Sequence, residues 1–115
     1  MTRPTRPVSW IKQARKDFEA LPEGARLICL NALTIAAEGG KADIAKPLPE
    51  LGRGTFEVTF TYQGEAYRLA YNVAVDADVW VLHAFHKKST RGIKTSQRDL
   101  DVIRNRLRAL KEMLR

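Results

Sequence analysis

Hydrophobic and polar positions follow two different periods along this chain of 115 residues. In the N-terminal part, apolar residues recur every three or four positions, which is typical of helices. We expect a short strand at PVSWI, a helix over KQARKDFEAL, and a second helix from Glu23 to Glu38 that stops at Gly39-Gly40. Because Pro22 interrupts the pattern between them, the two helices should form a helical hairpin.

The period changes to two in the second half of the chain. Segments 56–62 and 67–73 alternate apolar and polar side chains on either side of a QGEA turn, which predicts a β-hairpin. The almost wholly apolar run VWVLHAF predicts a third, central strand that is covered on both faces. The glycine- and proline-containing stretch 39–54 predicts an ordered loop that leads into this antiparallel meander.

A final helix is expected to begin near Thr95 or Ser96. Asp99 and Asp101 in its first turn suit the positive end of the helix dipole. One face of this helix is apolar, and arginine and lysine occupy much of the rest; the apolar stripe consists of Leu100, Ile103, Leu107, Leu110 and Leu114. The whole pattern predicts one α+β domain spanning residues 1–115, with a small, mostly antiparallel sheet.

Charge changes this picture, because the chain carries a net charge of +7 and a sequence pI near 9.9. Residues 1–16 hold five basic and no acidic side chains, residues 17–85 hold five basic and ten acidic ones, and residues 86–115 hold ten basic and three acidic ones. The excess therefore belongs to the two ends. A basic excess of this size favours a polyanionic partner, although a merely soluble basic surface has the same composition.

The residues argue against disulfide bonds, metal sites and membrane spans. The single cysteine, Cys29, allows neither an internal disulfide nor a cysteine-based zinc site. His83 and His86 lie three apart on a predicted strand, so they point to opposite faces and are poorly placed to share a metal ion. We therefore expect no metal and no cofactor. The sequence has no secretory signal and no apolar stretch near the ~20 residues of a membrane span, which predicts a cytoplasmic protein.

Arg68 is the most informative single residue, because it interrupts the apolar and aromatic strand YRLAY. A buried guanidinium needs an anion, and two anions fit equally well at this stage. One is the carboxylate of Glu57 on the neighbouring strand, and the other is a phosphate group of a ligand.

More basic residues lie at the end of the third predicted strand. His86 precedes Lys87 and Lys88, and strict alternation would put His86 and Lys88 on one face. Imidazole titrates near neutral pH and can transfer protons, whereas His83 inside the apolar run fits a packed core histidine. A solvated strand end would account for the two lysines without any function.

Together the order of elements and the segments KPLPELGRGTFEV, YRLAY, VLHAFHKKS, GIKT and RDLDVIRNRL resemble the RelE/HigB toxin superfamily, in particular its HigB-like branch of phage-derived proteins. The resemblance extends from about Val8 to the last helix. It implies a RelE-like β-α-α-β-β-β-α fold and the toxin of a type II toxin–antitoxin system. Such a toxin is a metal-independent endoribonuclease that cuts mRNA on the ribosome, and a helix-turn-helix antitoxin neutralises it.

The resemblance also implies roles for individual residues. Arg68 matches an arginine placed against the scissile phosphate, and Lys88 matches a basic residue at the end of the last strand. We expect Arg68 and Lys88 to stabilise the charge of the transition state and His86, or less favourably Glu57, to transfer a proton. Further contacts with RNA are expected from four basic side chains: Arg53, Lys87, Arg91 and Lys94.

One departure from the family pattern leaves the mechanism open. The strand before the arginine carries basic residues in RelE, whereas Glu57 and Thr59 stand at the matching positions here. A lysine-based mechanism therefore does not transfer intact. The alternative is a non-catalytic RNA- or protein-binding module with a toxin-like fold. A DNA-binding regulator is disfavoured, because no helix-turn-helix pair with a recognition helix is visible.

Overall fold

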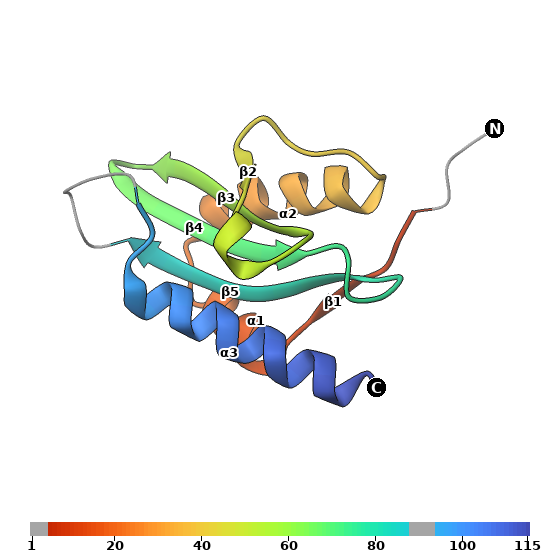
Figure 1. Ribbon diagram of the computed structural model, residues 1–115. Coiled ribbons are helices and arrows are strands. Elements are labelled where there is room, and N and C mark those ends of the chain that lie inside the picture. The colour runs from red at the N-terminus through yellow and green to blue at the C-terminus, as the bar shows by residue number, and fades with distance from the viewer. Residues whose placement is uncertain (1–4, 88–93) are drawn as a thin grey trace.

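The computed structural model describes residues 5–87 and 94–115. Within these ranges three helices and five strands follow one another (Figure 1): β1 (Val8–Trp10), α1 (Lys12–Glu19), α2 (Glu23–Ala37), β2 (Ala45–Pro47), β3 (Thr55–Tyr62), β4 (Glu65–Asn72), β5 (Val79–Lys87) and α3 (Gln97–Met113). The predicted order is confirmed. The stretch expected to be a loop also contains β2 and a short 3₁₀ turn at Pro49–Leu51, which are too short to produce a recognisable period.

The sheet has the strand order β1-β5-β4-β3-β2. Strand β1 pairs in parallel with β5, and the other neighbours are antiparallel, so the expected α+β class with a mostly antiparallel sheet is confirmed. The middle position belongs to β4, which is buried from Tyr67 to Asn72. Strand β5 lies between two strands only at Val79–Val81, and beyond that point its outer edge faces no strand of the described chain.

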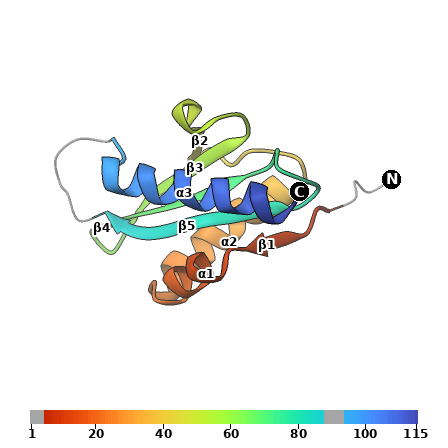
Figure 2. The ribbon, with the colours of Figure 1, turned by 60° about the horizontal axis from the view of Figure 1, so that its bottom comes forward.

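Helices cover both faces of the sheet (Figure 2). On one face, α1 and α2 pack against alternate residues of the sheet, among them Val58 and Leu69. On the other face, Ile103 and Leu107 of α3 pack against the sheet residues that point to that face, including Ala70. Strand β4 therefore contributes Tyr67, Leu69 and Tyr71 to one core and Ala70 to the other, as the pleat requires. No helix in the described ranges is long and apolar enough to cross a membrane.

Local capping fixes where α3 starts. Ser96 is its N-cap, and the side-chain oxygen of Ser96 accepts a hydrogen bond from the backbone N–H of Asp99 at 3.1 Å. The predicted start near Thr95 or Ser96 is therefore confirmed. As a result, Thr95 lies immediately before the helix and next to the end of the sheet.

Candidate functional site

Three polar side chains meet beneath the start of α3: Glu57 of β3, Arg68 of β4 and Thr95. The guanidinium Nη1 of Arg68 donates to Glu57 Oε1 at 2.8 Å and to the hydroxyl of Thr95 at 2.8 Å. The same hydroxyl donates to Glu57 Oε2 at 2.6 Å. Glu57 is fully buried and Arg68 is 3% exposed. We call these three residues the Glu57 cluster.

The register of the hairpin explains why Glu57 and Arg68 meet. Arg68 lies opposite Thr59, and Glu57 lies opposite Ala70, so the two charged residues are diagonal neighbours on one face of the sheet. A buried guanidinium needs a compensating carboxylate, because an unpaired charge in the interior is costly. Arg68 thus interrupts an apolar strand at the place where β3 supplies an acid.

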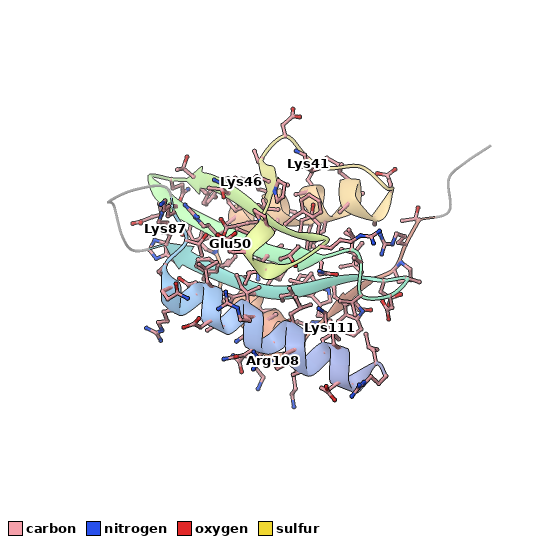
Figure 3. All side chains as sticks on the ribbon, viewed as in Figure 1. Lys41, Lys46, Glu50, Lys87, Arg108 and Lys111 are labelled. Carbon is pink, nitrogen blue, oxygen red and sulfur yellow. The ribbon has the colours of Figure 1, made fainter. Side chains whose placement is uncertain are left out.

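A hollow of about 380 Å³ opens over the Glu57 cluster, and its walls include Lys46 of β2, Glu57, Arg68, Lys94 and Thr95. We call it the Arg68 hollow. Lys46 and Lys87 lie at the same end of the sheet (Figure 3). Partial desolvation and the positive charges of Arg68 and Lys46 lower the pKa of Lys87, while the charge of Glu57 acts in the opposite direction. This end of the sheet therefore combines a buried acid with several cations.

The predicted basic residues fall into three groups. Lys87 lies on the same face as Arg68, since Arg68 pairs with Phe85 and Lys87 is two positions further along β5. Lys94 lines the Arg68 hollow. Arg53 lines a different hollow, together with Lys111. The other two basic residues predicted at the site, Lys88 and Arg91, lie outside the described residues.

His86 does not join Arg68. It lies opposite Tyr67, its ring centroid is 5.1 Å from the Tyr67 ring, and its Nε2 is 2.8 Å from Glu65 Oε2. Because Tyr67 and Arg68 are consecutive on β4, they point to opposite faces, and so do His86 and Arg68. The prediction that these two side chains act on one phosphate therefore disagrees with the register of β4 and β5.

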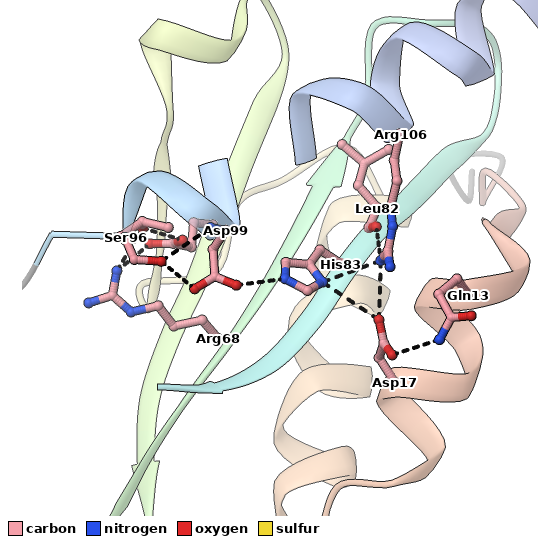
Figure 4. A network of polar contacts seen from close by, with 10 residues as sticks. Gln13, Asp17, Arg68, Leu82, His83, Ser96, Asp99 and Arg106 are labelled. Carbon is pink, nitrogen blue, oxygen red and sulfur yellow. Dashed lines mark hydrogen bonds and ion pairs between the residues drawn. The ribbon is translucent and has the colours of Figure 1, made fainter. Parts of the chain in front are cut away.

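A second polar network ties three elements together, and sequence reasoning did not find it (Figure 4). His83 of β5 places its Nε2 3.0 Å from Asp99 Oδ1 of α3 and its Nδ1 3.6 Å from Asp17 Oδ2 of α1. Arg106 of α3 donates to Asp17 Oδ2 at 3.1 Å and to the carbonyl of Leu82 at 3.0 Å. We call Asp17, His83, Asp99 and Arg106 the His83 network.

Burial determines the charge of His83. Desolvation lowers the pKa of the imidazole, and the charge of Arg106 acts in the same direction, while the hydrogen bond to Asp99 and the charges of Asp99 and Asp17 oppose the shift. The neutral ring is therefore favoured, with Nε2–H directed at Asp99 and Nδ1 lying 3.3 Å from Arg106 Nη1. The only signal of this network in the sequence is one imidazole in an apolar strand, because its partners lie on distant segments.

Beside the His83 network lies a larger cleft of about 780 Å³, which we call the β5 cleft. It follows the end of β5 and the first turns of α3, and its walls include His83, Phe85, Lys87, Lys94, Arg98 and Asp99. Lys94 and Thr95 line both this cleft and the Arg68 hollow, so the two depressions adjoin.

The described residues contain no group of three or more His, Cys, Asp or Glu side chains that is arranged to hold a metal ion. As expected from their spacing, His83 and His86 project from opposite faces of β5: His83 contacts Asp99, whereas His86 lies against Tyr67.

Comparison with known proteins assigns the chain to a family. Residues 16–108 match the family described as "Phage derived protein Gp49-like (DUF891)". A mutant of the E. coli toxin RelE in the free state superposes with a TM-score of 0.60 at 16% identity, over 75% of this chain and 87% of that one. The toxin–antitoxin complex RelBE2 from Mycobacterium tuberculosis gives a TM-score of 0.51 at 23% identity, over 74% and 94%. No curated protein sequence matches the chain.

Proposed function

The chain belongs to the Gp49-like family of phage-derived proteins and has the RelE-like fold, and from this premise we propose that it is the toxin of a type II toxin–antitoxin system. Its activity is that of a metal-independent endoribonuclease that cuts mRNA on the ribosome. One observation carries the proposal. The Thr95 hydroxyl lies between the Glu57 carboxylate and the Arg68 guanidinium, donating to the first and accepting from the second.

This arrangement suits attack by the 2′-hydroxyl of RNA on the adjacent phosphate. When a substrate replaces Thr95, Glu57 accepts the proton of the 2′-hydroxyl as its oxygen bonds to phosphorus, and Arg68 stabilises the added negative charge. The bond from phosphorus to the 5′ oxygen breaks, and that oxygen takes up a proton. The products are a 2′,3′-cyclic phosphate and a 5′-hydroxyl end.

We assign the proton for the leaving 5′ oxygen to Lys87. It lies on the face of Arg68, and its pKa is lowered by partial desolvation and by the cations Arg68 and Lys46, which makes the ammonium a stronger acid. The general base is Glu57 rather than His86, because Glu57 contacts Arg68 directly and His86 lies on the opposite face. Lys94 and Lys46 then hold neighbouring phosphates at the Arg68 hollow.

The proposal includes a protein partner. The RelBE2 structure with the same fold is a toxin–antitoxin complex. By analogy, a cognate helix-turn-helix antitoxin binds this chain and covers its basic surface. Induction of the chain alone should then arrest growth, and co-expression of that antitoxin should restore it.

A second candidate function is a non-catalytic binding module. The burial of Arg68 favours it, because a guanidinium that is 3% exposed and paired with Glu57 has its charge satisfied inside the protein. In that case the Glu57 cluster would only stabilise the fold, and the basic surface would bind RNA or a protein without cleavage.

Growth after induction separates the two functions. We expect the parent chain to arrest growth and Glu57→Gln to relieve the arrest, since the amide keeps the shape of the side chain but cannot act as the base. Lys87→Gln should relieve the arrest in part. Arg108→Gln removes an exposed cation on α3 and serves as the matched control that keeps the toxicity of the parent.

The level of soluble, folded protein must be equal in all four strains for this comparison. A parent chain that is abundant, folded and harmless would contradict an active toxin and favour the binding module. Equal toxicity of the parent and Glu57→Gln would contradict the role of Glu57.

A further inference from the structure

Two rings of β5 form an aromatic surface that the proposed chemistry does not use. Phe85 and His83 are two positions apart on the same face of the strand, their ring centroids are 4.4 Å apart, and their planes differ by 18°. Both rings line the β5 cleft. Phe85 is only partly buried, although an apolar side chain of this size gains by full burial. A partly exposed aromatic ring in a cleft with charged side chains in its walls is suited to stacking with a planar ligand.

Cations line the same cleft as these two rings, together with the carboxylates of Asp17 and Asp99. The walls of the β5 cleft include Lys87, Lys94 and Arg98, from the end of β5 and from the start of α3. Lys87 is held in place by a hydrogen bond from its Nζ to the carbonyl of Lys94 at 3.0 Å. Positive charge next to an aromatic face is the combination by which proteins bind single-stranded nucleic acid, since the cations follow the phosphates and the rings stack on the bases.

The β5 cleft lies next to the Glu57 cluster. Phe85 is the direct cross-strand neighbour of Arg68, and Lys94 and Thr95 form a common wall of the cleft and the Arg68 hollow. A ligand in the cleft therefore lies next to a phosphate held by Arg68. A volume of about 780 Å³ is within the range of small-molecule sites and accommodates a nucleotide.

We propose that the β5 cleft binds the nucleotide adjacent to the cleaved bond, with its base stacked on Phe85 and its phosphate held by Lys94 and Arg98. Phe85 is then a residue that determines specificity rather than a catalytic residue. The inference rests on the proposed ribonuclease function and adds to it the subsite that receives a base. A base in this subsite contributes binding through its π face, which every base has, and the shape of the cleft selects among bases.

The test is a titration of the folded full-length chain with adenosine 3′-monophosphate, with inorganic phosphate as the probe that lacks a base. We expect the adenosine nucleotide to bind more tightly than phosphate and to shift the ring proton resonances of Phe85 in the NMR spectrum. Phe85→Leu should weaken nucleotide binding by roughly 5- to 150-fold, which is the loss that one stacked base typically causes, and should leave phosphate binding unchanged.

Phe60→Leu is the matched control. Phe60 is also a partly buried ring of the sheet, but it stacks on Tyr67 on the opposite face, so its replacement should leave nucleotide binding unchanged. The ring shifts of Phe85 in the parent chain test the proposal even if Phe85→Leu does not fold. Equal affinity for phosphate and nucleotide, or no shift of the Phe85 resonances, would overturn it.

Nucleotide binding requires no cleavage, so the failure of this inference can be told apart from the failure of the proposed function. A chain that stacks the nucleotide on Phe85 but cuts no RNA would refute only the ribonuclease. A chain that cuts RNA but whose Phe85→Leu variant keeps the nucleotide affinity and the cleavage sites of the parent would refute only the base subsite.

Discussion

At the scale of single residues, Glu57 and Arg68 combine a structural role with a proposed chemical one. Their ion pair is buried almost completely, and the Thr95 hydroxyl completes it by bonding to both partners. Such a pair contributes little net stability compared with apolar residues of the same size, but the loss of one partner leaves a charge without compensation. A substrate that displaces Thr95 would meet both charges in a fixed geometry.

This geometry predicts a large effect of Glu57→Gln on stability. The variant leaves Arg68 charged and buried opposite a neutral amide, so we expect the free energy of unfolding to fall by about 3–5 kcal/mol in urea denaturation. Asp101→Asn is the control, because it breaks the exposed pair with Arg104, where side chains are 54% and 39% exposed, and should cost less than about 1 kcal/mol. Equal losses in the two variants would contradict the assigned burial of the Glu57 cluster.

The sequence was sufficient to single out Arg68 and to name Glu57 as one of two anions for it, the other being a phosphate. The pairing with Glu57 became visible only in the structure. The sequence was not sufficient to place His86. Alternation along β5 shows which residues share a face, but the face that also carries Arg68 depends on the register between β4 and β5. That register places Phe85 opposite Arg68, so Lys87 and not His86 lies on the side of the cluster.

At the scale of elements, the His83 network joins α1, β5 and α3 where the outer edge of β5 has no described strand beside it. Arg106 donates to the carbonyl of Leu82 at this edge. The three helices and the strands β3, β4 and β5 were predictable from their periods and apolar runs, whereas β2 was not. Their contact at His83 was not, because Asp17 and Asp99 are separated by most of the chain and each fits a solvated helix position.

The network predicts a dependence of stability on pH. The pKa of His83 in the folded chain is lowered from its ordinary value of 6.5 by desolvation and by Arg106, against the opposing effect of Asp99 and Asp17. The unfolded chain therefore takes up a proton more readily, and the stability present above pH 6.5 is lost as the pH falls below that value. His83→Gln should flatten this part of the profile of unfolding free energy against pH.

His86→Gln is the control for that profile, because it changes a half-exposed imidazole outside the network. We expect it to keep the slope of the parent below pH 6.5. A slope that disappears in His86→Gln and persists in His83→Gln would show that the titrating group had been assigned wrongly.

At the scale of the whole molecule, the described part of the basic C-terminal segment runs from one end of the molecule to the other. The end of β5 and the start of α3 lie at one end of the molecule, whereas β1 and the last turn of α3 lie at the other (Figures 1 and 2). The positive charge of residues 94–115 is thus spread along α3. The composition shows the basic excess but not where it lies. The fold places Lys87 and Lys94 next to the Glu57 cluster and Arg108 and Lys111 away from it.

This division predicts how binding of single-stranded RNA depends on salt. Each phosphate contact adds about 0.7 to the slope of log affinity against log salt concentration. Lys94→Gln should therefore reduce the slope by about that amount, and Arg108→Gln should leave it nearly unchanged. Equal reductions in both variants would indicate that RNA follows the whole of α3 instead of the end of the sheet.

The central claim is that Glu57 acts as the base in RNA cleavage, and the most direct test is the rate and the end groups of cleavage on programmed ribosomes. We expect the parent chain to leave 2′,3′-cyclic phosphate and 5′-hydroxyl ends, and folded Glu57→Gln to be slower by about 100-fold or more. Cleavage by Glu57→Gln at the rate of the parent, or no cleavage by the folded parent, would contradict the claim.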